Sequence, residues 1–345
     1  MSGHVLVARL DNEGDVLLAG PAIRAVAAGA EHVTLLCGPN GRQAAALLPG
    51  VDDIVVRRAE WIDPDPEPVR RGSIDAFVDE LAARRLDEAF ILSSFHQSPL
   101  PLALLLRLAG VPRIGATSDD YPGSLLDVRH RIDDDVHEVE RSLSLMRAME
   151  HRLPADDDGA LRVLPGSVDL PFDEPYVVVH PGASVPARAW APERHAELVA
   201  ALASDGWNVA VTGSASERAL TARVAADHAR DLGGETDLAQ LAAVLAGAAA
   251  VVVGNTGPAH LAAAVGTPVV SLYAPTVPAV RWRPWRVPHA ILHEPVPCAG
   301  CRARSCPVPG HPCIDELPTA AVLAAVRRLA TPAPVAPAVE EATAA

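Results

Sequence analysis

The stretch VVVGNTGPAHLAAAVGTPVV, residues 251–270, decides the fold of this chain. It opens on three valines that are typical of a buried strand, turns at Gly254–Gly257, and continues in an alanine-rich segment. A second β-branched run follows after Pro268. A strand, a turn, a helix and a second strand in this order indicate a βαβ unit, in which a helix joins two parallel strands. Ala262–Ala264 allow that helix to pack close to the sheet.

The same alternation of short β-branched runs with helical patterns extends through most of the chain. The expected strands are 4–9, 32–36, 53–57, 88–92, 176–180, 208–212, 249–254 and 268–272, and the expected helices are 16–28, 42–48, 74–84, 100–108, 136–151, 193–203, 216–229, 238–246, 259–265 and 319–329. This pattern predicts an α/β fold of two tandem Rossmann-like domains, each with a doubly wound parallel sheet. Ligands of such pairs bind at the carboxyl ends of the strands, in the inter-domain cleft.

Breaks in the rhythm mark the expected domain boundaries. The alternation stops in a polar stretch over 119–165, and the linker before Tyr176 is rich in Pro, Gly and Asp. We therefore expect a first domain over 1–165 and a second over 174–330. The last segment, 331–345, consists mainly of Pro, Ala and Glu, and we expect a disordered tail there.

Charge and hydrophobicity exclude several functional classes. The 345 residues carry 43 acidic and 29 basic side chains, a net charge of −14, and every basic one is Arg because no Lys occurs. So acidic a chain has no general attraction for nucleic acid and at most touches a membrane surface. The longest apolar run, Leu241–Val253, is short of the roughly 18 residues that span a bilayer. With no signal peptide at the N-terminus, we expect a cytoplasmic protein.

Two loops of the second half suit a phosphorylated ligand. The strand ending at His180 runs into a Gly-containing turn, after which Ser184 and Arg188 offer side-chain donors to a phosphate; a plain surface turn is the alternative. Glu217 follows the next strand, where a carboxylate could accept from ribose hydroxyls. The same Glu could equally serve the dipole of the helix that begins there.

The loop of the opening stretch is the sharper signal. Thr256 and Gly257 leave free N–H groups at a helix N-terminus, where the positive end of the dipole would meet a diphosphate. Pro258 suits the first helical position, and His260 lies on the same first turn. Because neither G-x-G-x-x-G after the first strand nor a P-loop occurs, nicotinamide and Walker-type nucleotide binding lack their motifs.

The first domain offers a candidate base. Asp15 follows the first expected strand in the loop RLDNEGD, at the mouth of the predicted cleft. An ionised carboxylate there could act as a general base on a hydroxyl. The alternative is that Asp15 caps the expected helix 16–28.

Four cysteines gather near the C-terminus. Their spacing, Cys298-x2-Cys301-x4-Cys306-x6-Cys313, could close a tetrahedral zinc site, although it contains only one C-x2-C pair. Reduced thiols that shape a loop are the interpretation we favour for a reducing compartment.

These loops, in this order, resemble glycosyltransferase family 9, the ADP-heptose:lipopolysaccharide heptosyltransferases and their relatives. The resemblance covers roughly residues 4 to 330. It is carried by the segments VLVARLDNEGDVLLAGPAIRAV (5–26), VVVHPGASVPARAWAPERHAEL (177–198), GNTGPAHLAAAVGTPVVSLYAPT (254–276) and PCAGCRARSCPVPGHPC (297–313). Each motif alone is weak, but four in register are specific.

The resemblance implies a GT-B fold, with an N-terminal acceptor domain, a C-terminal nucleotide-sugar domain and a final helix that crosses back. It implies an inverting transfer that needs no cofactor and no essential metal. Asp15 matches the family's catalytic base, and Arg188 stands where the family usually has Lys beside the leaving diphosphate. The other matching positions are Glu217 at the ribose, Thr236 near the adenine, and Asn255, Thr256, Gly257 and His260 at the diphosphate and sugar.

The expected function is therefore transfer of a heptose or related sugar from an ADP-sugar to a hydroxyl of a surface glycan or of an acceptor like the lipopolysaccharide core. Members commonly read Asp-Thr-Gly where this chain has Asn255, which leaves the donor sugar open. The alternatives are a transferase of the same fold that uses a UDP- or GDP-sugar, a non-catalytic nucleotide-sugar-binding protein, and an epimerase of the same fold, which would need no acceptor.

Overall fold

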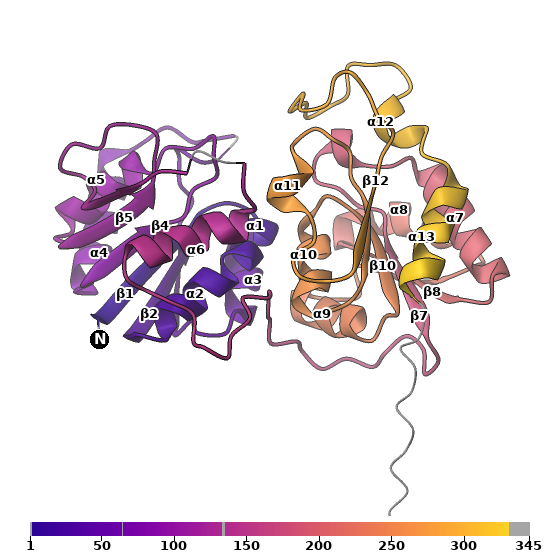
Figure 1. The fold of residues 1–345 in the computed structure, drawn as a ribbon, viewed down its shortest axis with the longest axis horizontal. Coiled ribbons are helices and arrows are strands. Elements are labelled where there is room, and N and C mark those ends of the chain that lie inside the picture. The colour runs from indigo at the N-terminus through magenta and orange to yellow at the C-terminus, as the bar shows by residue number, and fades with distance from the viewer. Residues whose placement is uncertain (1, 64, 133–134, 331–345) are drawn as a thin grey trace, which may run out of the picture.

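The computed structural model describes residues 2–63, 65–132 and 135–330. Within these ranges the chain forms two sheets of six strands each, and every strand pairing is parallel. Figure 1 shows them side by side, the indigo-to-magenta half beside the pink-to-yellow half. We call the first sheet with its covering helices the N-terminal unit, and the second the C-terminal unit.

The N-terminal unit has the strand order β3-β2-β1-β4-β5-β6. Its strands are β1 (Ser2–Arg9), β2 (Ala30–Cys37), β3 (Asp53–Val56), β4 (Glu88–Ile91), β5 (Arg113–Thr117) and β6 (Val128–His130). Its helices are α1 (Glu13–Leu18), α2 (Gly20–Ala27), η1 (Pro39–Gly41), α3 (Arg42–Leu47), α4 (Arg71–Ala83), α5 (Leu100–Leu108) and α6 (Glu138–Ala148).

The C-terminal unit has the strand order β12-β11-β10-β7-β8-β9. Its strands are β7 (Tyr176–His180), β8 (Asn208–Gly213), β9 (Arg230–Gly233), β10 (Ala250–Gly254), β11 (Val269–Leu272) and β12 (His289–Leu292). Its helices are η2 (Pro186–Arg188), α7 (Pro192–Ser204), η3 (Ala215–Glu217), α8 (Arg218–Ala225), α9 (Leu238–Ala246), α10 (Gly257–Ala264), α11 (Ala279–Trp282), α12 (Pro312–Asp315) and α13 (Thr319–Leu329).

Both sheets follow the Rossmann order 3-2-1-4-5-6, so the predicted α/β fold is confirmed. In each sheet the chain starts at a central strand, β1 or β7, and adds two strands on one side of it. The remaining three strands are then added on the other side. The order therefore reverses between β1 and β4 and between β7 and β10. A crevice opens at such a reversal, at the carboxyl ends of the strands, and this is where doubly wound sheets bind ligands.

Three apolar clusters build the core. One lies under α4 and α5, on the outer face of the first sheet, and another under α7, α8 and α13 on the outer face of the second. The third contains buried side chains of α1, α2, α3 and α6 together with those of α9 and α10. Because this third cluster continues from one unit into the other, the inner helices of the two units share a core.

The structure corrects four expectations. The expected helix 16–28 is two helices that divide at Ala19, because Pro21 has no N–H for the carbonyl one turn earlier. The strands β5, β6, β9 and β12 were missed, and β6 lies inside the stretch read as a polar excursion. Pro258 is the second residue of α10, not the first.

The fourth correction concerns the final helix. The resemblance implied that it crosses back to the N-terminal unit, but α13 packs against α7 and the strands β10–β12 of the C-terminal unit. Its Val322 and Val326 are fully buried in the outer core of that unit. The expected tail, 331–345, lies outside the described residues.

In the described part of the chain, none of the helices combines the length and the apolar character that crossing a bilayer requires.

A buried ion pair ties the segment after α6 to the N-terminal unit, and it generates a prediction about pH. Arg24 Nε and Nη2 lie 2.6 and 3.0 Å from the two carboxylate oxygens of Asp157, and Nη2 also donates to Ala160 O at 2.7 Å. The hydrogen bond from Arg24 lowers the pKa of Asp157 to about 2. A carboxylate with a depressed pKa contributes stability above its ordinary pKa, and this contribution is lost as the pH falls through the depressed value.

We therefore expect Asp157→Asn to lower the free energy of unfolding by about 2 kcal/mol at pH 7. The difference from wild type should shrink as the pH falls below about 4. Urea unfolding of both proteins at pH 7, 4 and 2.5 measures it. A difference that stays constant over this range would contradict the ionic origin of the stabilisation.

Candidate active site

A cleft of about 590 Å³ lies between the two units. Loops that follow β1, β2, β3 and β4 line it on one side, and loops that follow β7, β10, β11 and β12 line it on the other. The cleft therefore lies at the carboxyl ends of both sheets. The sequence-predicted residues that line it are Asp15, Ser184, Arg188, Asn255, Thr256, Gly257 and His260.

Asp15 is the third residue of α1, whose N-cap is Asn12, so it does not cap the helix as the alternative had it. Its Oδ1 accepts from Arg9 Nη2 at 2.9 Å. The side chain is 20% exposed, whereas that of Arg9 is only 2% exposed. The buried Arg9 guanidinium thus holds one oxygen of the Asp15 carboxylate, and the carboxylate lies at the surface of the cleft.

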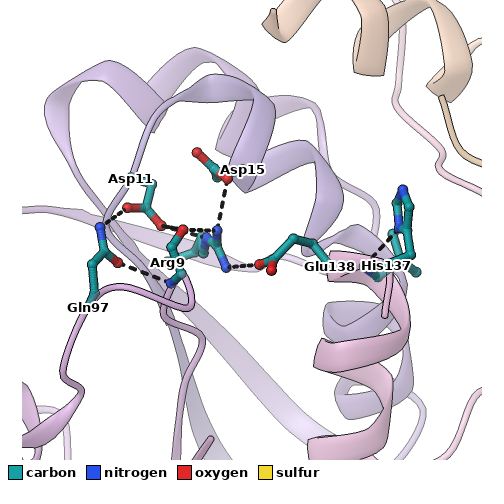
Figure 2. A network of polar contacts seen from close by, with 8 residues as sticks. Arg9, Asp11, Asp15, Gln97, His137 and Glu138 are labelled. Carbon is teal, nitrogen blue, oxygen red and sulfur yellow. Dashed lines mark hydrogen bonds and ion pairs between the residues drawn. The ribbon is translucent and has the colours of Figure 1, made fainter. Parts of the chain in front are cut away.

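Arg9 ends β1 and is the centre of a polar network (Figure 2). Its guanidinium contacts the carboxylates of Asp11 at 2.8 Å, Asp15 at 2.9 Å and Glu138 at 3.3 Å. It also donates to Ser94 Oγ at 3.0 Å. One buried cation therefore holds carboxylates from the loop after β1, from α1 and from the first turn of α6.

The burial of this network shifts its pKa values. Burial alone would lower the pKa of Arg9, but the three carboxylates outweigh it and raise the pKa. Burial raises the pKa of Asp11 and that of Glu138, and Arg9 opposes both shifts. Arg9 is therefore permanently charged, and it provides the counter-charge without which two buried carboxylates could not remain ionised.

The opposite wall of the cleft carries a cation without a counter-ion. Arg188 ends η2, and its Nε is buried and makes no hydrogen bond within the described residues. Burial lowers the pKa of Arg188, and the charge of Asp15 across the cleft opposes this shift. A guanidinium pKa lies so high that the group stays charged, so Arg188 presents an uncompensated positive charge to the cleft.

Two further polar atoms on this wall lack partners. Thr256 is the N-cap of α10, yet its buried Oγ1 forms no hydrogen bond in the described part of the chain. His260 is 4% exposed, and its Nδ1 is likewise buried and unpaired there. Burial, together with the charge of Arg188, lowers the pKa of His260 to about 4, so the imidazole is neutral at pH 7. Buried polar groups are normally hydrogen-bonded, so these atoms are suited to hydrogen-bond a polar ligand in the cleft.

The N-termini of α1 and α10 meet at two glycines. A Cβ on Gly14 would lie 3.2 Å from Gly257 Cα and 3.0 Å from His260 Cδ2, which is closer than side chains normally pack. Gly14 therefore allows the two units to approach at the floor of the cleft. The first N–H groups of α10 and the positive end of its dipole lie at this point, where they suit an anion.

The remaining predicted residues have other surroundings. Glu217 accepts from Ser214 N at 2.8 Å in a capping box at η3 and covers Gly182, and it does not line the described cleft. Thr236 precedes Asp237, the N-cap of α9, and also lies outside the lining. Asn255 is 5% exposed and hydrogen-bonds the Tyr273 hydroxyl.

The sequence analysis did not single out Arg9 or Glu138, which form the network behind the cleft wall. It also did not single out Arg302 and Arg304, which line the cleft. Arg9 could have been found, because it is the last residue of a predicted strand and precedes three acidic residues. Glu138 lies 129 positions away from Arg9, and no local pattern connects the two.

The cysteine cluster shows no metal centre. Cys298 and Cys301 are exposed, Cys306 is half-buried and Cys313 is buried. In the described ranges, no group of three or more His, Cys, Asp or Glu side chains is arranged to hold a metal ion. Burial raises the pKa of Cys313 to about 11, and the other three thiols contribute to this shift. We therefore treat the cysteines as thiols of a loop.

Comparison with known proteins assigns the family. Residues 95–311, more than half of the chain, match glycosyltransferase family 9 (heptosyltransferase). The chain is 28% identical to lipopolysaccharide heptosyltransferase 2 of Salmonella typhimurium over 255 residues, which are 65% of this chain and 72% of that protein. It is 35% identical to lipopolysaccharide heptosyltransferase 1 of Pseudomonas aeruginosa over 176 residues, or 49% and 48% of the two chains.

A solved structure shares the fold. The ADP-heptose lipopolysaccharide heptosyltransferase II of E. coli superimposes with a TM-score of 0.71 at 22% identity, over 95% of this chain and 98% of that chain. The architecture of two parallel α/β units that enclose a cleft confirms the expected GT-B fold.

The Arg9 network generates a prediction about stability. Arg9→Met leaves three carboxylates without their buried cation, so we expect the free energy of unfolding to fall by about 3–5 kcal/mol at pH 8. The loss should be smaller at pH 5, because protonation of Asp11 and Glu138 removes the uncompensated charge. Denaturant unfolding at the two pH values measures it.

Arg71→Met is the matched control, because Arg71 is 93% exposed and pairs only with the surface residue Asp75 among the described residues. We expect it to cost less than about 1 kcal/mol at either pH. Equal losses for Arg9→Met at pH 8 and pH 5 would refute the electrostatic account.

Proposed function

The chain belongs to glycosyltransferase family 9 and is a glycosyltransferase, and we propose that it transfers a heptose or related sugar from an ADP-sugar to a hydroxyl of a glycan or glycolipid acceptor. The relatives named above are lipopolysaccharide heptosyltransferases, which supports a heptose donor and an acceptor like the lipopolysaccharide core. We propose further that the reaction inverts the sugar's configuration, needs no metal, and takes place in the cytoplasm with at most peripheral membrane contact.

One observation carries this proposal: a carboxylate and an uncompensated cation face each other across the cleft. Asp15 stands on the N-terminal wall, held by Arg9, and Arg188 stands on the C-terminal wall beside the N-terminus of α10. A base and an anion site on opposite walls suit a single displacement. The acceptor then enters from the face opposite the departing phosphate, which inverts the anomeric carbon.

In the proposed step, Asp15 takes the proton of the acceptor hydroxyl while the oxygen bonds to the anomeric carbon. The bond from that carbon to the phosphate oxygen breaks, and its electron pair leaves with the diphosphate. Arg188, Thr256 Oγ1 and the N–H groups of α10 stabilise the charge that develops there. We assign neutral His260 to a hydroxyl of the sugar or to a phosphate oxygen, because its Nδ1 lacks another partner.

This scheme gives each unit a role. We propose that residues 1–165 form the acceptor domain and residues 174–330 the nucleotide-sugar domain. Ser184 and Asn255 line the donor side of the cleft. Glu217 and Thr236 are proposed to hold the ribose and adenine, respectively. Because Glu217 is engaged in a capping box, its part in binding requires that it exchange or share its bond to Ser214.

The donor nucleotide is tested by calorimetric titration of ADP, UDP and GDP. We expect wild type to bind ADP most tightly, and Arg188→Ala to weaken ADP binding about 10- to 100-fold through loss of a charge-assisted contact. Arg194→Ala, an exposed arginine of α7 outside the cleft, should bind as wild type. Preference for UDP or GDP would overturn the ADP-sugar donor, and absence of binding by all three would contradict the nucleotide-sugar site.

The base is tested by Asp15→Asn, which keeps an oxygen for Arg9 but cannot take a proton. We expect transfer to fall by about 10²- to 10⁴-fold while ADP affinity stays within about twofold of wild type. Radiolabelled or mass-detected sugar transfer to a glycan acceptor measures the rate. Asp75→Asn, on the exposed face of α4, is the control and should transfer normally. Undiminished transfer by Asp15→Asn would exclude Asp15 as the base.

A further inference from the structure

The cysteine-rich loop, residues 298–306, forms part of the cleft wall. Gly300 N donates to Pro275 O at 2.7 Å and Arg302 N donates to Thr276 O at 2.9 Å, which anchors the loop to the segment after β11. Ala187 N donates to Arg304 O at 3.0 Å, which anchors it to η2. The loop is therefore fixed to two other segments of the same wall by backbone hydrogen bonds.

This loop brings two more arginines to the cleft, Arg302 and Arg304. Neither forms an ion pair with a carboxylate in the ranges that the structure describes, although acidic residues outnumber basic ones 43 to 29 in this chain. The charge of Arg304 reaches Arg188, since it adds to the burial that lowers the pKa of Arg188. Like charges repel, so a cluster of uncompensated guanidiniums is held together by the fold and not by attraction.

The two loop arginines differ in what they face. The Arg302 guanidinium lies 4.5 Å from the ring centre of Phe95, a residue of the N-terminal unit, and thus spans the cleft. Arg304 remains on the C-terminal wall, because its carbonyl is bonded to the residue that directly precedes Arg188. Of the two, Arg304 is the one placed beside the anion site.

We propose that Arg304 is a second diphosphate-binding residue, which together with Arg188 grips the donor's diphosphate from the cysteine-rich loop. This inference rests on the proposed function and deepens it. The wall holds buried polar atoms without partners at Arg188, Thr256 and His260, so a ligand that accepts several hydrogen bonds fits there. Two guanidinium forks match the oxygens of a diphosphate, and both also stabilise the charge that it gains as the sugar leaves.

The proposal gives the cysteine-rich loop a function, which is to position Arg304. The loop is short and has little apolar surface of its own. Three of its nine residues are cysteines (Cys298, Cys301 and Cys306), and Arg304 lies between the last two. Its backbone hydrogen bonds with Pro275, Thr276 and Ala187 fix the backbone position of Arg304. They therefore reduce the conformational entropy that is lost when a ligand orders the Arg304 side chain.

The experiment is calorimetric titration of ADP, inorganic pyrophosphate and adenosine into wild type, Arg304→Ala, Arg304→Lys and the double variant Arg188→Ala/Arg304→Ala. We expect Arg304→Ala to weaken ADP and pyrophosphate about tenfold and to leave adenosine unchanged. Arg304→Lys should recover part of the loss, because it keeps the charge but not the fork. The double variant should lose less than the product of the single losses if both side chains grip one diphosphate.

Arg194→Ala serves again as the control, and the thermal midpoint of each variant shows whether it folds. Arg304 is exposed, so we expect no change in that midpoint. Wild-type affinity of Arg304→Ala for pyrophosphate would overturn the inference, and so would a loss that extends equally to adenosine. Pyrophosphate carries no base, so its result stands even if wild type prefers UDP or GDP and the proposed ADP donor fails.

Discussion

The contact between Arg9 and its three carboxylates is the constraint on which the N-terminal half of the site depends. A guanidinium that is 2% exposed cannot be left without counter-charge, and Asp11, Asp15 and Glu138 come from three separate segments. Their attraction to one cation fixes the loop after β1, the first turn of α1 and the first turn of α6 relative to the sheet. The orientation of Asp15 is thus set by a buried guanidinium that does not itself line the cleft.

The second constraint is the approach of the two units at Gly14 and Gly257. A Cβ on Gly14 would lie only 3.2 Å from Gly257 Cα, so this approach of the two helices depends on Gly14, and the continuous apolar cluster contains buried side chains of both helices. The first N–H groups of α10 lie at this contact and Asp15 lies in the first turn of α1, so the packing of the two helix N-termini positions both proposed parts of the reaction.

Much of this arrangement could be predicted from the sequence, because it follows from local rules. The alternation of β-branched strands with helices predicted the parallel sheets and the cleft, and the loops after the strands, together with the family resemblance, gave the seven lining positions. What failed depends on contacts between distant residues.

The strand β5 contains Gly115, where a Cβ would lie 2.7 Å from Met149 Sδ, so packing and not β propensity places it. The sequence alone could not decide whether Asp15 caps a helix, because the helix was expected to begin at Val16, whereas α1 begins at Glu13 with Asn12 as its N-cap. The ion pair of Arg9 with Glu138, which belongs to another element, could not be predicted either. The position of α13 was inferred by resemblance, and the burial of Val322 and Val326 in the C-terminal unit overrides it.

The distribution of charge across the cleft explains why an acidic chain can accept an anion. On the N-terminal wall Asp11 and Asp15 are paired with Arg9 and Asp63 is paired with Arg58, and burial raises the pKa of Asp11 and that of Glu138. The arginines of the C-terminal wall, Arg188, Arg302 and Arg304, have no carboxylate partner among the described residues, so their positive potential is not cancelled locally. A net charge of −14 acts at long range and is screened by salt over about 10 Å, whereas these cations act at contact distance. Local placement therefore outweighs the overall charge, and the polarity of the cleft fits the proposed binding of a phosphorylated group on one wall and of a hydroxyl on the other.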